Sequence, residues 1–248
     1  MESLKSRPAH IVSQSYFNSC WVLTSPWGMG WVRALCVFRG FGVWFVVFLF
    51  GRLVGEVAWR WVGCLVYAVI SAQVIFAVSS VLASIILFGN EYRGLMGLKA
   101  SSGCVSKAVA ASLILSLPVT FLINFLGSAS GLARAGIPLL IPVILILSPV
   151  GEELLFRGLL LGCLMKCIGR WPSILISSMV FALAHPLTFS LHSATSQTIF
   201  LVFAGALVLG LVAGYFRAFT SSLTPAIIAH SIFNLSGIIT GAVVRLLA

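Results

Sequence analysis

Three short stretches place polar side chains inside apolar sequence. In the first, Ser148–Gly158, two adjacent carboxylates are followed by an arginine: Glu152, Glu153 and Arg157. An ionisable residue within a membrane-spanning helix is costly, so it marks a functional site by default. At about 100° per residue, Glu153 and Arg157 share a helix face and can form an ion pair. Glu152 points elsewhere and has no partner on its own helix. Its carboxylate is therefore a candidate general base.

The other two stretches supply imidazole and amide groups. One is Phe181-Ala-Leu-Ala-His185, and the other runs from His230 to Asn234. His230 and Asn234 are four residues apart and stack on one helix face. Together the three stretches offer a carboxylate base, two histidines and an amide donor. This set can activate water and stabilise an oxyanion.

Depth in the membrane predicts that Glu152 and His185 meet. Gly169 marks the turn between their two helices, with Glu152 17 residues before it and His185 16 residues after it. At about 1.5 Å per residue, both lie roughly 24–26 Å from that turn. His230 lies only about seven residues, or roughly 11 Å, into the last helix. Either the Phe216–Thr224 connection dips into the membrane or that helix begins elsewhere.

The order of these motifs resembles a known family. Glu-Glu-x-x-x-Arg, Phe-x-x-x-His and His-x-x-x-Asn follow one another on three hydrophobic helices, with Pro-Ala-Ile-Ile-Ala before the last histidine. This pattern is similar to the CAAX-protease and bacteriocin-processing (Abi) family of intramembrane endopeptidases, whose eukaryotic relative is the Ras-converting CAAX prenyl endopeptidase. The resemblance covers about Pro138–Leu247.

The resemblance implies proteolysis near the C-terminus of a membrane-associated peptide or protein. It implies that Glu152 activates water with His185 beside it, and that His230 and Asn234 stabilise the oxyanion. The remaining positions of the pattern are supporting ones: Glu153, Arg157 and Phe181.

The need for a cofactor stays open between two alternatives. Glu152, His185 and His230 could hold zinc and leave a fourth position for water. Asn234 is a poor zinc ligand and a good oxyanion donor. We therefore favour a mechanism that requires no cofactor. Other intramembrane protease designs are excluded, because the chain lacks a His-Glu-x-x-His signature and contains no aspartate for an aspartate pair.

Composition defines the elements that position these residues. Of 248 residues, 60% are hydrophobic and 8% charged, and the mean hydropathy is +1.13. A soluble domain has roughly 25% charged residues. The sequence therefore predicts an all-α, polytopic membrane helix bundle of about seven transmembrane helices (six to eight) around an intramembrane polar site. The expected spans are Ala34–Gly51, Trp61–Phe88, Ala108–Leu126, Ile137–Ile168, Trp171–His185, Thr198–Phe216 and Leu223–Val244. The fifth is expected to stop at Pro186.

We divide the chain into three parts. Residues 1–33 form an N-terminal tail and interfacial segment, 34–130 the N-terminal transmembrane helices, and 131–248 the catalytic core. The six cysteines are expected to be small packing residues in helices. Gly205, Gly210 and Gly214 are expected to allow close helix packing.

Positive charges predict the orientation and the partners. Nine Lys and Arg residues fall on the side of the N-terminus and four on the other side. The N-terminus and the turn at Gly169 are therefore expected to be cytoplasmic, in the inner membrane of a bacterial source. The net charge of +10 indicates contact with lipid headgroups, and no pattern indicates nucleic acid. The oligomeric state is not predicted.

Two functional hypotheses follow. The first is an intramembrane endopeptidase that acts by direct attack of water, on a substrate such as a peptide pheromone, a bacteriocin precursor or a sorting-signal tail. The second is a non-enzymatic membrane immunity or peptide-binding protein that uses the same polar pocket. A transporter is disfavoured, because the sequence shows no two related halves.

Overall fold

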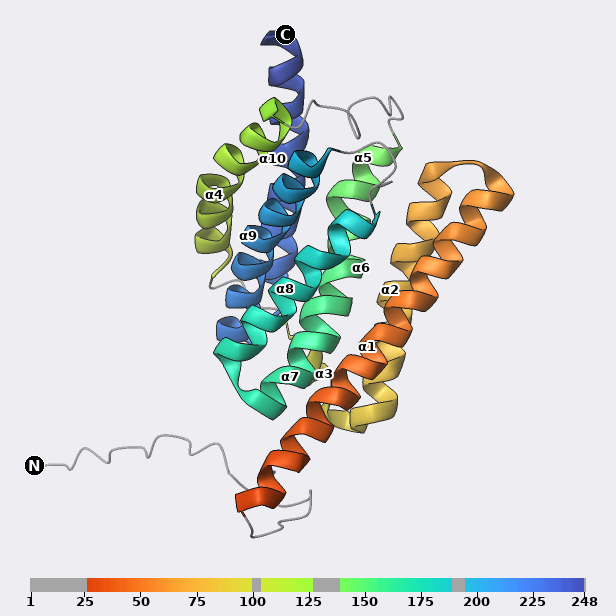
Figure 1. The fold of residues 1–248 in the computed structure, drawn as a ribbon, viewed down its shortest axis with the longest axis vertical. Helices are drawn as coiled ribbons and strands as arrows, with labels where there is room; N and C mark the ends of the chain where they lie inside the picture. Colours follow the sequence, from red (N-terminus) through yellow and green to blue (C-terminus); the bar gives the residue numbers. More distant parts are fainter. Residues whose placement is uncertain (1–25, 100–103, 127–138, 189–194, 248) are drawn as a thin grey trace, which may run out of the picture.

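The computed structural model describes residues 26–99, 104–126, 139–188 and 195–247, with side chains from residue 33 onward except at 187 and 188. Within these ranges every regular element is a helix (Figure 1), which confirms the predicted all-α fold. The long helices are α1 (Pro26–Val62), α2 (Leu65–Phe88), α4 (Val105–Leu126), α8 (Arg170–Thr188), α9 (Ser196–Thr220) and α10 (Thr224–Leu247). Between α2 and α4 lie a 3-10 turn, η2 (Gly89–Glu91), and the short α3 (Tyr92–Met96).

The polar residues at 152–157 lie on one continuous helical rod. Its segments are α5 (Leu140–Pro142), η3 (Val143–Leu147), α6 (Ser148–Glu153), η4 (Leu154–Leu160) and α7 (Leu161–Ile168), of which η3 and η4 are π-helical. At about 1.5 Å per residue, the rod is roughly 43 Å long, enough to cross a bilayer. Five of the described segments are long and apolar enough to cross a membrane: four lie in α1, α4, α9 and α10, and the other runs from α2 through α3. With the rod and α8, the architecture agrees with the predicted bundle of about seven.

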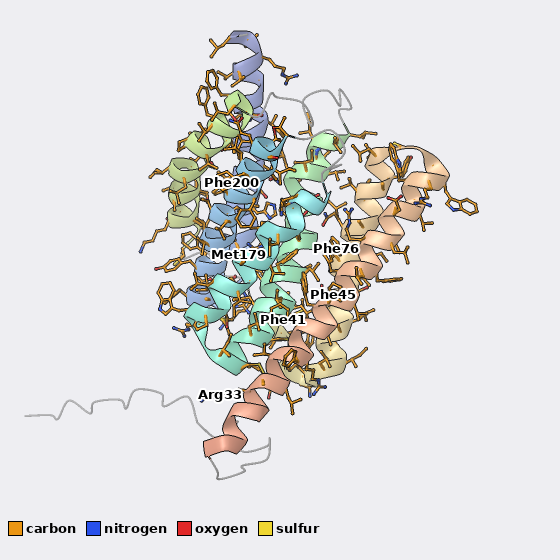
Figure 2. All side chains as sticks on the ribbon, in the orientation of Figure 1. Arg33, Phe41, Phe45, Phe76, Met179 and Phe200 are labelled. Atoms are coloured by element: carbon orange, nitrogen blue, oxygen red, sulfur yellow. A yellow bond between two sulfur atoms is a disulfide. The ribbon has the colours of Figure 1, made fainter. Side chains whose placement is uncertain are left out.

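The rod lies at the centre of the bundle. In Figure 1 the α1–α2 hairpin flanks it on one side, and α8, α9, α10 and α4 lie on the other. An aromatic contact joins the hairpin to the rod, because Trp44 of α1 lies 5.5 Å from Phe156 of η4. Within the hairpin, Phe48 of α1 stacks on Phe76 of α2 at 5.9 Å. Phe156 in turn meets Phe181 of α8 edge to face at 5.0 Å. Figure 2 shows the side chains along these helices, with Phe76 labelled between the hairpin and the rod.

Small residues let helices approach each other on the far side of the bundle. A Cβ on Gly210 of α9 would lie 3.0 Å from Ser178 of α8, and one on Gly205 would lie 2.7 Å from Ile123 of α4. Both contacts confirm the predicted close packing, as does Gly214, where a Cβ would lie 3.3 Å from Ile174.

The predicted helix ends are wrong at several places. Helix α1 extends well beyond the expected Ala34–Gly51, and its arginines do not interrupt it because they remain outside the core. Helix α2 begins at Leu65 because Gly63 breaks the chain with a φ of +66°. Helix α8 continues through Pro186 to Thr188. Proline there removes only one hydrogen bond in the last turn, and the helix ends two residues later.

The connection between α9 and α10 lies deep inside the bundle. The Leu223 N–H donates to the carbonyl of Gly97, 2.9 Å away, just after α3. A Cβ on Gly158 would lie 3.7 Å from the Leu223 side chain. Gly158 is about 16 Å along the rod from Gly169, and the seven residues from Leu223 to His230 add roughly 11 Å. His230 therefore reaches the depth of Glu152, and the dipping connection is the correct alternative.

A disulfide contradicts the prediction that all cysteines are packing residues. Cys36 of α1 and Cys167 of α7 form it, with Cα atoms 5.9 Å apart and 131 residues between them in sequence. Sequence spacing cannot reveal such a pair, because it depends on which turn of α1 meets the end of the rod. Cys163 is buried, as predicted, and Cys64 and Cys104 are partly buried. Cys20 lies outside the described residues.

Candidate active site

Glu152 lies at the meeting point of four helices. Its side chain, from α6, is 18% exposed. Oε1 accepts a hydrogen bond from Gln73 Nε2 of α2 at 3.0 Å. Oε2 lies 3.9 Å from His185 Nε2 of α8 and 3.8 Å from His230 Nε2 of α10. This oxygen is buried and accepts no hydrogen bond from the described residues. The structure thus brings Glu152, His185 and His230 together.

The hydrogen bonds fix which nitrogen of each histidine faces Glu152. His185 Nδ1 lies 2.9 Å from the carbonyl of Phe181, which can only accept, so Nδ1 carries the hydrogen. His230 Nδ1 lies 2.8 Å from Glu153 Oε1, and a carboxylate likewise accepts. In a neutral imidazole the other nitrogen then has a lone pair. The Nε2 atoms are the ones that lie 3.8–3.9 Å from Glu152 Oε2, and a water molecule can bridge polar atoms at such distances.

Glu153 and Arg157 form a buried network behind the histidines. Arg157 Nη1 donates to Glu153 Oε1 at 3.0 Å, and both side chains are 0% exposed, which confirms their predicted pairing. The guanidinium lies 4.1 Å from the ring centroid of Phe181, a cation–π contact. The Phe181 ring also packs edge to face on His230 at 5.7 Å. Glu153 thus accepts from both Arg157 and His230 and holds His230 in place.

Asn234 binds a carbonyl that a proline leaves free. In the π-helical register of η3, each carbonyl pairs with the N–H five residues later, as Val143 does with Ser148. The partner of Ile144 would be Pro149, which has no N–H. Asn234 Nδ2 donates to this Ile144 carbonyl at 2.9 Å. The bond uses one of the two amide hydrogens. The described contacts of Asn234 do not include Glu152 or either histidine.

The predicted zinc ligands do not form a closed site as they stand. In a tetrahedral zinc site with bonds of about 2.0–2.2 Å, ligand atoms lie roughly 3.3 Å apart. Both Nε2 atoms are farther than that from Glu152 Oε2, at 3.8 and 3.9 Å. No group of three His, Cys, Asp or Glu side chains within the described ranges meets the geometry for a metal ion. We therefore derive no step through a metal.

Sequence reasoning missed Gln73, which contacts the carboxylate directly. It is a buried amide in the middle of the apolar helix α2, and its side chain is 6% exposed. The signal was present, because Gln73 is the one amide side chain between Leu65 and Phe88. Nothing in the sequence showed, however, which face of α2 meets the rod.

The fold and the site define an all-α membrane helix bundle with a carboxylate–histidine cluster at its centre. Residues 134–236 match the family model described as Type II CAAX prenyl endopeptidase Rce1-like. This segment contains every predicted site residue, and its match to the family model confirms the resemblance drawn from the motifs. The match supports a CAAX-type intramembrane protease in general. Gln73 lies outside the matched segment. No curated protein and no solved structure matches the chain.

Proposed function

We propose that the protein is an intramembrane endopeptidase that uses Glu152 to activate water. One observation carries this proposal. Glu152 Oε2 has no hydrogen-bond donor among the described residues and faces the Nε2 atoms of His185 and His230 at 3.8–3.9 Å. A buried carboxylate oxygen with two imidazole nitrogens beside it suits a water molecule, which needs two to four polar partners.

The proposed reaction has two proton transfers. Glu152 Oε2 takes a proton from water as the water oxygen bonds to the peptide carbonyl carbon. The tetrahedral intermediate then collapses, the C–N bond breaks, and the proton on Glu152 passes to the leaving amine. No acyl-enzyme forms, because water attacks directly.

His230 and Asn234 are proposed to stabilise the oxyanion. His230 bonds to Glu153 through Nδ1. When His230 carries both ring hydrogens, Nδ1–H donates to Glu153 and Nε2–H can donate to the oxyanion. A buried carboxylate stabilises the imidazolium of a catalytic histidine in the same way elsewhere. Asn234 offers the amide hydrogen that Ile144 does not use. Each such donor is typically worth 10²–10³-fold in rate.

The surroundings of the site support a hydrophobic substrate. A shallow apolar groove runs along α5, η3 and α6 and ends two residues before Glu152; its lining is Pro142, Val143, Ile146, Leu147 and Val150. We propose that a membrane-associated peptide or protein lies there and is cut near its C-terminus. The inner membrane, the cytoplasmic N-terminus and the absence of a required metal are parts of the same proposal.

A cleavage assay on purified protein in lipid nanodiscs tests this proposal. Peptides with hydrophobic C-terminal segments are incubated with wild type and with Glu152→Gln, each with and without a strong chelator, and products are identified by mass spectrometry. We expect cleavage by wild type that survives the chelator and is lost in the variant. Glu56→Gln, at an exposed acid on α1, is the control and should cleave normally. Full activity in Glu152→Gln refutes the mechanism, and binding of peptides without cleavage favours the peptide-binding alternative.

A further inference from the structure

Gln73 reaches the candidate base from a helix outside the family-matched segment. Its Nε2 lies 3.0 Å from Glu152 Oε1. The carboxylate can only accept, so the amide must present its NH₂ group to Glu152. A flipped amide would place two acceptors against each other. The Gln73 side chain is buried, and its amide nitrogen uses one hydrogen in the bond to Glu152.

Gly151 makes this approach possible. A Cβ on Gly151 would lie 2.5 Å from Gln73 Oε1 and 2.8 Å from the Gln73 carbonyl oxygen. Such distances are too short for any side chain, so only glycine lets α2 come this close to α6. The two helices thus approach each other closely beside Glu152. The Gln73 amide therefore packs directly against Gly151, the residue before Glu152.

The contact fixes one end of the carboxylate. A glutamate side chain has a freely turning terminal carboxylate, because that last torsion is broad and roughly two-fold. With Oε1 held by Gln73, Oε2 is the oxygen that faces His185 and His230. We propose that Gln73 is a positioning residue, which holds Oε1 of Glu152 so that Oε2 is turned to receive the proton of the attacking water. This inference rests on the proposed function and assigns part of the active site to the N-terminal helices.

Two variants separate positioning from simple packing. Gln73→Met keeps the length and volume of the side chain but has no donor. Gly151→Ala keeps the Gln73 amide group itself, but the added Cβ should displace that amide from Glu152. Ser80→Ala is the control, because Ser80 is a buried hydroxyl of the same helix without a hydrogen bond in the structure. Folding of each variant is checked by size-exclusion chromatography and thermal melting.

The readout does not depend on a substrate. Hydrophobic carbodiimides modify carboxyl groups, so the labelling rate of Glu152 at pH 7, measured by peptide mass spectrometry, reports how readily that carboxyl reacts. The hydrogen bond from Gln73 covers Oε1 and restrains the carboxylate. Its loss in Gln73→Met should raise the labelling rate roughly tenfold. Gly151→Ala should raise it as well, while Ser80→Ala should leave it unchanged. An unchanged rate in a folded Gln73→Met or a folded Gly151→Ala overturns the proposal.

Cleavage kinetics then distinguish this inference from the proposed function. With a cleaved peptide, Gln73→Met should lower kcat by about tenfold and change KM little, because the substrate groove is intact. If kcat is unchanged while Glu152→Gln is inactive, the proposed function stands and the role of Gln73 is wrong. If Glu152→Gln remains active, the proposed function fails, whatever Gln73 does to labelling.

Discussion

The described residues include two Glu–Arg ion pairs of the same spacing that differ in burial, and we expect the same substitution to destabilise the protein far more at the buried pair. Glu153–Arg157 is an i,i+4 pair at 3.0 Å with both side chains 0% exposed. Glu56–Arg60 is an i,i+4 pair at 2.9 Å with side chains 52% and 74% exposed. Arg157→Met leaves the charge of Glu153 buried with only His230 as a partner. We expect a loss of about 3–5 kcal/mol in the free energy of unfolding. Arg60→Met should cost less than about 1 kcal/mol.

A double-mutant cycle shows whether the charge itself causes the loss. Glu153→Gln combined with Arg157→Met removes both charges, so it should cost no more than Arg157→Met alone, and the two single effects should not add. Unfolding in mixed micelles with increasing SDS, followed by tryptophan fluorescence, measures each value; Trp44 of the core is a buried probe. Additive effects, or an Arg157→Met that is as mild as Arg60→Met, would refute the buried network.

Two further predictions concern packing and the disulfide. Gly162→Ala should lower the free energy of unfolding by roughly 1–3 kcal/mol in the same assay, because its Cβ would clash with the carbonyl oxygen of Leu95. Gly42→Ala is the control: its Cβ would meet open space, so the substitution should be neutral or slightly stabilising. Protein purified without reductant should give a linked Cys36–Cys167 peptide in mass spectrometry. In cells the predicted cytoplasmic location of this end should keep both thiols reduced and reactive with maleimide. Two reactive thiols in the unreduced purified protein would contradict the disulfide, and a bonded pair in cells would contradict the orientation.

Features that depend on one helix or one turn were predictable from the sequence. The i,i+4 spacing of Glu153 and Arg157 identifies their pairing without knowledge of the fold. Counting residues from Gly169 placed Glu152 and His185 at one depth, because a single residue there separates two antiparallel helices. These two local rules were enough to locate the centre of the site.

Features that depend on how separate helices meet were not predictable. Gln73 contacts Glu152 only because Gly151 brings α2 against α6, and no pattern in α2 marks that face. The depth of His230 follows from the α9–α10 connection, which is held inside the bundle by a hydrogen bond from Leu223 to Gly97. Asn234 binds Ile144 because a π-helical register and Pro149 together free one carbonyl. Each of these contacts depends on how two helices that are distant in sequence pack together, so none could be predicted from the sequence alone.

The central claim is that the Glu152 carboxylate is the base for peptide hydrolysis, and the Glu152→Gln variant tests it most directly. The substitution keeps the shape of the side chain and removes its basicity. Cleavage rates of wild type and variant are compared in the same nanodiscs, with the unfolding free energy of each measured in parallel. A general base contributes about 10²–10⁴-fold, so we expect the rate to fall by at least about 100-fold while the protein stays folded. A folded Glu152→Gln that cleaves at the wild-type rate would contradict the account.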